Sequence, residues 1–253
     1  MVENSVGQRI KSQQSLAVLE RRGGTLHLHD PEGGYLGRRR LPVPGCPTPR
    51  IFDAVSTPRG IVVLALCRGK RLNTRAFAVL EEEAGAGGRV LGSWAARPRP
   101  EAAVDPYFAP VIAASSRGVV FGNGNDACLA QSDLTGLPLD SLCPQGLPRL
   151  PLPDDARTNL ERAHLAARAL GARLSDPTHL PRFDRIHLVA RDRYAYRTPS
   201  PRSPRGRRLL IPGQNGSAAT LLPVSNRAFA APGEALLAWL HQGEVRLARY
   251  PLP

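Results

Sequence analysis

The sequence predicts an all-β fold with one inserted α-helix, and three observations predict it. Short apolar runs of about five to seven residues recur along the chain, bounded by Gly, Pro, Asp or Ser, and such lengths suit strands. The runs follow one another almost without helices, which disfavours a parallel α/β sheet. Antiparallel units recur at intervals of about 40–60 residues, a spacing typical of a β-propeller. We therefore expect a β-propeller of four to six blades of antiparallel strands.

The expected strands are rich in Val, Ile and Tyr, which fit a pleated surface. They form three fuller blades near residues 50–95, 108–142 and 182–223, with three further strands toward each end of the chain. Strands are expected at 16–20, 25–30, 35–41, 50–56, 61–66, 76–81, 89–94, 108–115, 119–123, 127–133, 185–190, 193–198, 208–212, 219–224, 228–231, 235–240 and 244–250.

Several hairpins are expected to turn on the pattern Asp-x-x-Gly or a Gly-rich equivalent. The pattern occurs from Asp30 to Gly33 and from Asp133 to Gly136, and residues 81–88 form the Gly-rich equivalent. An Asp side chain bonds the local backbone, and Gly accepts a positive φ.

One segment, DDARTNLERAHLAARALGARL at 154–174, has apolar residues at three-and-four spacing and predicts a helix. Asp154 or Asp155 is expected to cap its start, and Gly171 to weaken its final turn. The preceding CPQGLPRLPLP (143–153) predicts an extended linker, because Pro fixes φ and removes backbone donors. The 253 residues therefore form a single propeller domain over 14–253, with an N-terminal segment at 1–13 and a Pro-rich and helical excursion at 143–181.

Three stretches carry a resemblance to a known family. GGTLHLHDPEGGYLGRRRLPVPG (23–45) resembles the blade-closing hairpin of bacterial six-bladed β-propellers of the NHL/TolB-like kind, and SSRGVVFGN (115–123) and APGEALLAWL (231–240) are similar to their blade-opening strand. The resemblance covers most of residues 14–250, and the excursion at 143–181 resembles one found between two blades. It implies six blades. Because this chain is shorter than such proteins usually are, we expect it to lack an N-terminal blade or to close with fewer blades.

The chain is strongly basic, with a formal net charge of +13. Of its 34 basic residues only Lys11 and Lys70 are lysines. A basic face attracts polyanions such as nucleic acid, but the densest segments, 38–40, 68–71 and 197–208, are scattered, which favours compositional bias instead. The segment RTPSPRSPRGRR (197–208) is expected to be an exposed loop.

Aromatic residues make up only 5% of the chain, which disfavours a surface that stacks the bases of single-stranded nucleic acid. The best candidate is Arg193-Tyr194-Ala-Tyr196-Arg197. A blade strand showing its tyrosines to the core between blades is favoured, and Trp94 and Trp239 are expected to pack between blades as well.

The four cysteines, Cys46, Cys67, Cys128 and Cys143, show no C-x-x-C spacing and no His at ligand distance, which disfavours a zinc site. Cys67 and Cys128 lie in apolar strand-like runs and are interpreted as small hydrophobes. Cys46 and Cys143 lie beside prolines in loops, and the sequence leaves a disulfide between them open.

His27 and His29 lie on one face of an expected strand, and Asp30 follows, which resembles part of a metal site. The remaining histidines show no matching pattern, so a polar strand face ending in a turn is favoured, and no metal or cofactor is predicted.

Two further motifs are interpreted as turns. Gly122, Gly124 and Ala127 match G-x-G-x-x-A, but a second strand follows where a dinucleotide site needs a helix. Asn215-Gly216-Ser217 fits a glycosylation acceptor, although Asn-Gly is also a favoured tight-turn pair.

The leading functional hypothesis is a non-catalytic binding or protein-interaction scaffold that uses the loops at one end of the blade ring for an unidentified protein or small ligand. A metal-dependent, lactonase-like propeller hydrolase is the alternative, and binding of a polyanion through Arg-rich loops is the third. The hydrolase would need polar side chains to converge on the central channel, and no catalytic residue is assigned. The residues near strand ends that could do so are Asp53, Asn123, Asp184 and Asn226.

The N-terminus, MVENSVGQRIKSQQSLAVLE, has no apolar core region and no cleavage site of a secretory signal. As written, the chain is expected in the cytoplasm, and an exported protein is expected if its true start lies upstream. No apolar run reaches the roughly 18 residues that span a membrane.

Overall fold

A computed structural model gives the structure of the chain. It describes residues 10–12, 15–20, 25–30, 32–40, 43, 45–69, 73–81, 88–97, 99, 101–191, 193–200, 203–212, 220–224, 227–231, 234–241 and 244–251.

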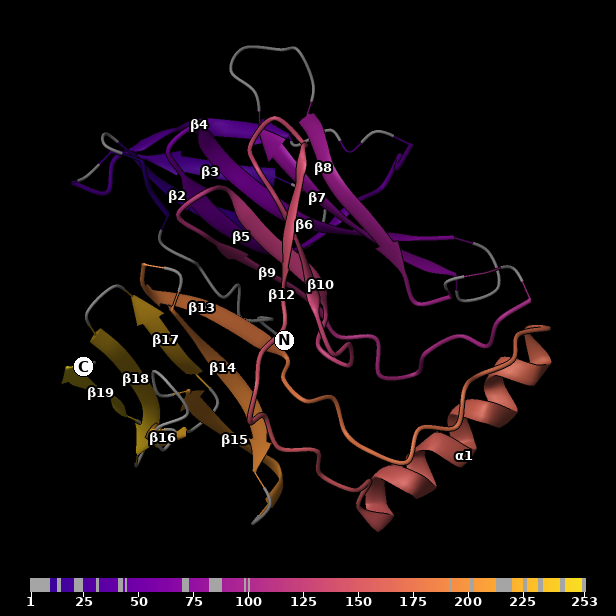
Figure 1. Cartoon of the computed structure of the whole chain (residues 1–253). Coiled ribbons are helices and arrows are strands. Elements are labelled where there is room, and N and C mark those ends of the chain that lie inside the picture. The colour runs from indigo at the N-terminus through magenta and orange to yellow at the C-terminus, as the bar shows by residue number, and fades with distance from the viewer. Residues whose placement is uncertain are drawn as a thin grey trace.

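The described residues form five antiparallel sheets, each built from strands that are consecutive in the chain (Figure 1). The first sheet contains β1 (Ile10–Ser12), β2 (Ser15–Glu20), β3 (Thr25–His29) and β4 (Tyr35–Arg40). The second contains β5 (Arg50–Thr57), β6 (Gly60–Arg68), β7 (Thr74–Glu81) and β8 (Gly88–Ala95). The third contains β9 (Pro110–Ala114), β10 (Val119–Asn123), β11 (Leu129–Ser132) and β12 (Pro138–Leu142). The fourth contains β13 (Arg185–Ala190), β14 (Arg193–Ser200), β15 (Ser203–Ile211) and β16 (Thr220–Val224), and the fifth β17 (Arg227–Ala231), β18 (Glu234–His241) and β19 (Glu244–Pro251).

The first strands of successive sheets lie against one another. β1 contacts β5, β5 contacts β9, β9 contacts β13 and β13 contacts β17. Sheets that stand side by side around their first strands are the arrangement of a β-propeller. The predicted all-β propeller with one inserted helix is therefore confirmed. The described part of the chain holds five sheets, so the six blades implied by the resemblance are not confirmed.

Alternating side chains bind each sheet to the sheets on both sides of it. In β6, Val63 and Ala65 belong to the core that faces the first sheet, whereas Val62 and Leu64 belong to the core shared with the third sheet. All four are fully buried. Successive side chains of a strand point to opposite faces, so a strand that is apolar at every position fits only a sheet covered on both faces.

The core between the third and fourth sheets contains the two tyrosines of β14. Tyr194 and Tyr196 are buried with Phe183, whose ring lies 5.2 Å from that of Tyr196. The interpretation of these tyrosines as core residues is confirmed. Trp94 also packs between sheets, stacked on Phe121 of the third sheet at 5.3 Å. The side chain of Trp239 lies outside the described residues.

Two hairpins turn on the predicted Asp-x-x-Gly pattern with the same bonds. The backbone N–H of Asp133 donates to Leu137 and that of Gly136 to Asp133, and the Asp133 carboxylate accepts from the N–H groups of Thr135 and Leu137. Asp30 and Gly33 repeat the backbone pattern. Gly33 and Gly136 have φ of 96° and 93°, the left-handed region where Gly is favoured. Residues 82–87 of the third expected turn lie outside the described residues.

The helix α1 (Asp154–Ala169) is shorter at its C-terminal end than the expected 154–174. Gly171, at φ 65°, donates to Arg168, and Ala172 donates to Ala167, which is the Schellman arrangement that ends a helix. The expected Asp cap is wrong: the N-cap is Pro153, without a side-chain cap bond, and both Asp residues lie in the first turn. α1 falls short of the length and apolarity needed to cross a bilayer.

One expectation about local structure is corrected, and two strands are additional. Residues 197–200 and 203–208 lie in strands and not in the expected loop, because β14 and β15 pair there, Thr198 opposite Arg208 and Pro199 opposite Arg207. Strands β1 and β12 were not expected.

The cysteines form two disulfides, Cys46–Cys67 and Cys128–Cys143, and the interpretation of Cys67 and Cys128 as plain hydrophobes is wrong. The pairing of Cys46 with Cys143 that the sequence left open does not occur. Both disulfides join a connection between sheets to the end of a hairpin: Cys46 follows β4 and Cys67 ends β6, while Cys143 follows β12 and Cys128 precedes β11.

Candidate functional site

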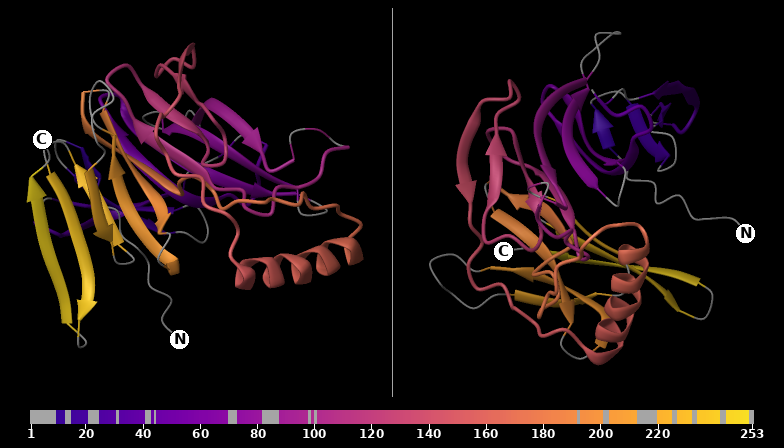
Figure 2. Two further views of the ribbon diagram at one scale, coloured as in Figure 1. Left: turned by 60° about the horizontal axis from the view of Figure 1, so that its bottom comes forward. Right: turned by 90° about the vertical axis from the view of Figure 1, so that its right-hand side faces the viewer.

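Two long connections between sheets meet two hairpin turns at one end of the propeller. Because neighbouring strands run in opposite directions, the β6–β7 turn (69–73) lies at the same end as the β8–β9 connection (96–109). The β10–β11 turn (124–128) likewise shares its end with the β12–β13 connection (143–184). We name this the loop end. Figure 2 shows that α1, within the last connection, stands outside the sheets.

A network of amides and one carboxylate holds the loop end together. Asn123, the last residue of β10, accepts from the backbone N–H of Ala109 at 3.0 Å and donates from Nδ2 to Asp105 at 3.2 Å. Asn125 Nδ2 donates to the same Asp105 oxygen at 2.8 Å and to the Tyr107 carbonyl at 3.0 Å. The N–H of Tyr107 donates to the other Asp105 oxygen at 2.8 Å. Both oxygens of Asp105 and both polar atoms of Asn123 are thus used to hold the β8–β9 connection.

The β10–β11 turn also carries the returning arm of the β12–β13 connection. Gly124 donates to Ala109 at 2.8 Å and accepts from Arg182 at 3.1 Å. A Cβ on Gly124 would lie 1.8 Å from the carbonyl oxygen of Phe183. The close backbone approach therefore requires Gly, which explains the motif from Gly122 to Ala127 as a turn, as predicted.

A cavity of about 880 Å³ lies at the loop end between the second and third sheets, and we name it the inter-sheet cavity. Its walls carry positive and negative side chains together, drawn from β7, β8, the β8–β9 connection and the β10–β11 turn. They include Arg75, Arg97, Arg99, Asp105 and Asp126, with Ser93, Trp94, Asn123 and Ser175 between them.

The surroundings affect the pKa of one of these charged groups, Asp126, and the orientation of another, Arg75. Burial raises the pKa of Asp126, the backbone of Asn123 opposes the shift, and the charge of Asp105 adds to it. Arg75 donates to Ser93 at 3.1 Å, and its guanidinium carbon lies 5.8 Å from the centre of the Phe77 ring. The ring and the hydroxyl together fix the direction of this guanidinium.

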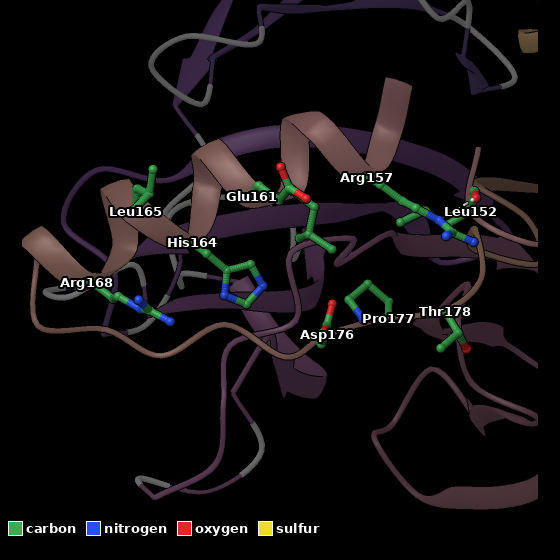
Figure 3. A pocket seen from close by; sticks show the side chains of 10 residues that line it. Leu152, Arg157, Glu161, His164, Leu165, Arg168, Asp176, Pro177 and Thr178 are labelled. Atoms are coloured by element: carbon green, nitrogen blue, oxygen red, sulfur yellow. Dashed lines mark hydrogen bonds between the residues drawn. The ribbon is translucent and has the colours of Figure 1, made fainter. Parts of the chain in front are cut away.

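A second hollow, of about 690 Å³, lies between α1 and the segment that follows it (Figure 3). His164 points from the helix toward Asp176 and Pro177, with Leu152 and Arg157 farther along the hollow. The hollow exists because the arms of the excursion pair: Leu152 donates to Thr178, and Leu180 donates to Leu150, each at 3.0 Å. On its other side α1 packs Ala163 and Ala167 against Ala96, Val104 and Leu174.

The side chains proposed for a hydrolase do not form one group. Asn123 lies in the loop-end network, while Asp53 sits in β5 and accepts from the N–H of Ala54 at 2.9 Å. Asp184 forms a half-buried ion pair with Arg197 at 2.6 Å. Asn226 lies outside the described residues. Within the part of the chain that the structure describes, no three His, Cys, Asp or Glu side chains are grouped to hold a metal ion.

His27, His29 and Asp30 form a strand face and its turn. Both histidine rings lie beside Tyr35, at 6.2 Å and 5.5 Å. Asp30 accepts from the N–H of Gly34, which closes the hairpin. Asp30 is thus used in the turn, as the favoured interpretation of this motif expects.

His187 is a half-buried histidine that the sequence did not single out. It lies in β13, and its Nε2 is enclosed without a hydrogen-bond partner in the described structure. Burial lowers the pKa of His187 to about 3, and the charges of Arg185 and Arg197 add to the shift, whereas Asp184 opposes it.

No family model and no curated protein matches the chain. Solved structures that are similar include a streptogramin B lyase (11% identity, TM-score 0.38, 96% of this chain and 67% of that one). A candidate 6-phosphogluconolactonase from Bacteroides uniformis is 11% identical, with a TM-score of 0.41 over 96% of this chain and 70% of the other. AztD from Citrobacter koseri is 10% identical, with a TM-score of 0.29 over 92% and 68%.

Proposed function

We propose that this chain is a non-catalytic β-propeller scaffold that binds its ligand or partner at the loop end. The observation that supports it most is that polar side chains at the loop end hydrogen-bond to other parts of the protein. Asn123, which a lactonase-like hydrolase would need free to hold a metal, is instead engaged within the protein: its side chain accepts from Ala109 and donates to Asp105.

The construction of the loop end also suits binding. Two disulfides and the Gly124 contacts attach the connections to hairpin ends, so the described parts of the loop end are fixed before a ligand arrives. A surface that is already ordered loses less conformational entropy when it binds. Loops positioned by a rigid scaffold are where binding residues concentrate.

A turnover assay with matched variants separates the scaffold from a hydrolase. We expect no lactone hydrolysis above the reagent blank with added Ca²⁺, Mn²⁺ or Zn²⁺, for the wild type, Asn123→Ala or the exposed control Arg149→Gln. We also expect Asn123→Ala to lower Tm, because it breaks the network. Metal-dependent hydrolysis that Asn123→Ala abolishes, at a temperature where the variant is folded, would overturn the scaffold.

Polyanion binding is a second candidate, and the β14–β15 hairpin favours it. The hairpin runs through a segment with six arginines, at 193, 197, 202, 205, 207 and 208, in a chain of net charge +13. Elution from heparin at increasing salt tests it, since phosphate or sulfate contacts weaken steeply with salt. We expect retention at 50 mM salt to fall in the Arg207→Gln/Arg208→Gln variant, and equal elution of both proteins would remove the candidate.

We further propose that the protein works in an oxidising compartment, contrary to the cytoplasmic expectation. The support is the pairing of all four cysteines, because disulfides persist mainly outside the cytosol. Alkylation of free thiols during lysis of the native cells tests it. We expect no labelled cysteine, and labelling of all four would overturn it.

A further inference from the structure

Three arginines, Arg75, Arg97 and Arg99, line the inter-sheet cavity. Arg75 is held by Ser93 and Phe77 and uses one of its five N–H groups on Ser93, so the others remain for a ligand. The backbone carbonyl of Arg99 accepts from Ala102, but within the described residues the side chains of Arg97 and Arg99 make neither a hydrogen bond nor an ion pair. Arginine presents a planar fork of donors that matches a carboxylate or phosphate group.

Two residues that line the cavity, Trp94 and Arg97, each carry one enclosed donor that the described structure leaves without an acceptor. Nε of Arg97 and Nε1 of Trp94 are both buried, and neither has a hydrogen-bond partner in the described structure. A buried donor without an acceptor is costly. An anion seated on the Arg97 guanidinium would offset this cost by supplying acceptor charge.

Two carboxyl groups, those of Asp105 and Asp126, also line the cavity. Asp105 receives three N–H donors, which offset its charge, and burial raises the pKa of Asp126. The three guanidinium groups outnumber the two carboxyl groups. The Asp126 carboxyl group offers an acceptor for hydroxyl or ammonium groups of the same ligand.

We infer that the inter-sheet cavity is a binding site for a small molecule that carries an oxyanion, a carboxylate or phosphate group, together with hydrogen-bond donors. Arg75, Arg97 and Arg99 receive the oxyanion, and Asp126 accepts from the donors. A volume of about 880 Å³ suits a metabolite-sized ligand. The inference names a ligand class for the proposed scaffold and rests on that function.

Tryptophan fluorescence provides a direct test, because the chain has two tryptophans and Trp94 lines the cavity. In a Trp239→Phe background, inorganic phosphate and citrate are titrated at constant ionic strength, with chloride and glycerol as controls. We expect a saturable change with at least one oxyanion and none with chloride or glycerol. Saturation by phosphate alone identifies a phosphate site, by citrate alone a carboxylate site, and by both a general oxyanion site.

Matched variants assign the binding to the cavity. We expect Arg97→Gln and Arg99→Gln each to weaken oxyanion binding about tenfold or more, since each removes a charge-assisted pair. Arg149→Gln, an exposed arginine outside the cavity, should leave the affinity within about twofold. Because Arg99 is exposed, we expect the Arg99→Gln variant to fold, so its affinity can be measured even if Arg97→Gln does not fold. No saturable change, or equal losses in Arg99→Gln and Arg149→Gln, would overturn the inference.

The two proposals fail separately. Metal-dependent lactone turnover would overturn the scaffold even if an oxyanion binds. If no oxyanion gives a saturable change in Trp94 fluorescence, the proposed ligand class is overturned. A binding role for the rest of the loop end, including α1, would still stand.

Discussion

The side-chain amide of Asn123 donates to the carboxylate of Asp105 across 3.2 Å, and this bond joins the end of β10 to the β8–β9 connection. Asn123 is buried, and its other polar atom accepts from Ala109. Because the polar atoms of both side chains are engaged by bonds within the protein, the pair contributes to holding the loop end rather than to chemistry on a substrate. The stability of the pair also depends on charge, because a second carboxylate in place of the Asn123 amide would face the carboxylate of Asp105.

Replacing the amide by a second carboxylate tests this relationship. Asn123→Asp removes the donor and places like charges together, so we expect a loss of about 3 kcal/mol of unfolding free energy at pH 7. The loss should shrink below about pH 4, where one carboxyl is protonated. Urea unfolding at both pH values measures it. The exposed helix control Asn159→Asp should change stability by less than about 0.5 kcal/mol, and equal effects of the two changes would contradict the assignment.

A methyl group at Gly124 should loosen the excursion. The Cβ would overlap the Phe183 carbonyl, so we expect Gly124→Ala to cost about 3 kcal/mol in urea unfolding. Gly146→Ala is the matched control, because it has open space and only the strain of its φ of 69°, about 1 kcal/mol. Hydrogen exchange at 182–183 should rise only in Gly124→Ala, and a variant as stable as the control would show that the backbones can separate.

The Asp133 turn should stabilise the fold only when its carboxyl is ionised. Hydrogen bonds from the Thr135 side chain and then from the backbone of Leu137, Thr135 and Gly136 outweigh desolvation and lower the pKa of Asp133. A carboxyl whose pKa is lower in the folded state stabilises above its unfolded pKa, and this contribution is lost as the pH falls below about 4. We expect Asp133→Asn to flatten the fall of the urea midpoint between pH 5 and pH 2. Parallel curves would contradict this.

His187 should stay neutral far below the ordinary histidine range. Its pKa of about 3 means that the unfolded chain takes up a proton near pH 6.5, whereas the folded chain does not. Stability should therefore fall as the pH is lowered from about 6.5 toward 3. Ring ¹⁵N shifts in a pH titration report the state directly. A His187 midpoint above pH 5 would show that water or a counter-charge reaches Nε2.

Loss of the exposed disulfide should destabilise the third sheet. Cys128 and Cys143 are 15 residues apart, and a loop of that size corresponds to about 3 kcal/mol of unfolding free energy. We expect the double variant Cys128→Ser/Cys143→Ser to have a lower Tm than the wild type, and we expect dithiothreitol to lower the Tm of the wild type as well. Non-reducing peptide mapping should show Cys46 joined to Cys67 and Cys128 to Cys143, and any other pairing would contradict the structure.

The strands were predictable because their burial on both faces is visible as continuous apolar sequence. The run at 61–66 is the clearest case, since both faces of β6 meet another sheet. The segment 197–208 was misjudged because Pro and Arg mask its pairing, although β14 and β15 meet there. Strand β12 has the sequence PLDSL, whose mostly solvent-facing side chains leave no apolar signal.

The candidate site was predictable only in part, because its members come from distant segments. Asn123 was singled out, but Asp105 lies 18 residues earlier in a connection without any periodic signal. Arg97 and Arg99 alternate with Pro, which predicts extended backbone and not a cavity wall. The disulfides were missed for the same reason, since only the folded sheet brings Cys46 beside Cys67.

Each sheet is completed by strands that follow one another without interruption, and this has a consequence for biogenesis. A blade needs nothing from later parts of the chain to pair its strands, so assembly can proceed blade by blade during synthesis. Both covalent links span 21 residues or fewer and so can form soon after their segments emerge. Nascent chains long enough for Cys143 to have left the ribosome should already contain both of them.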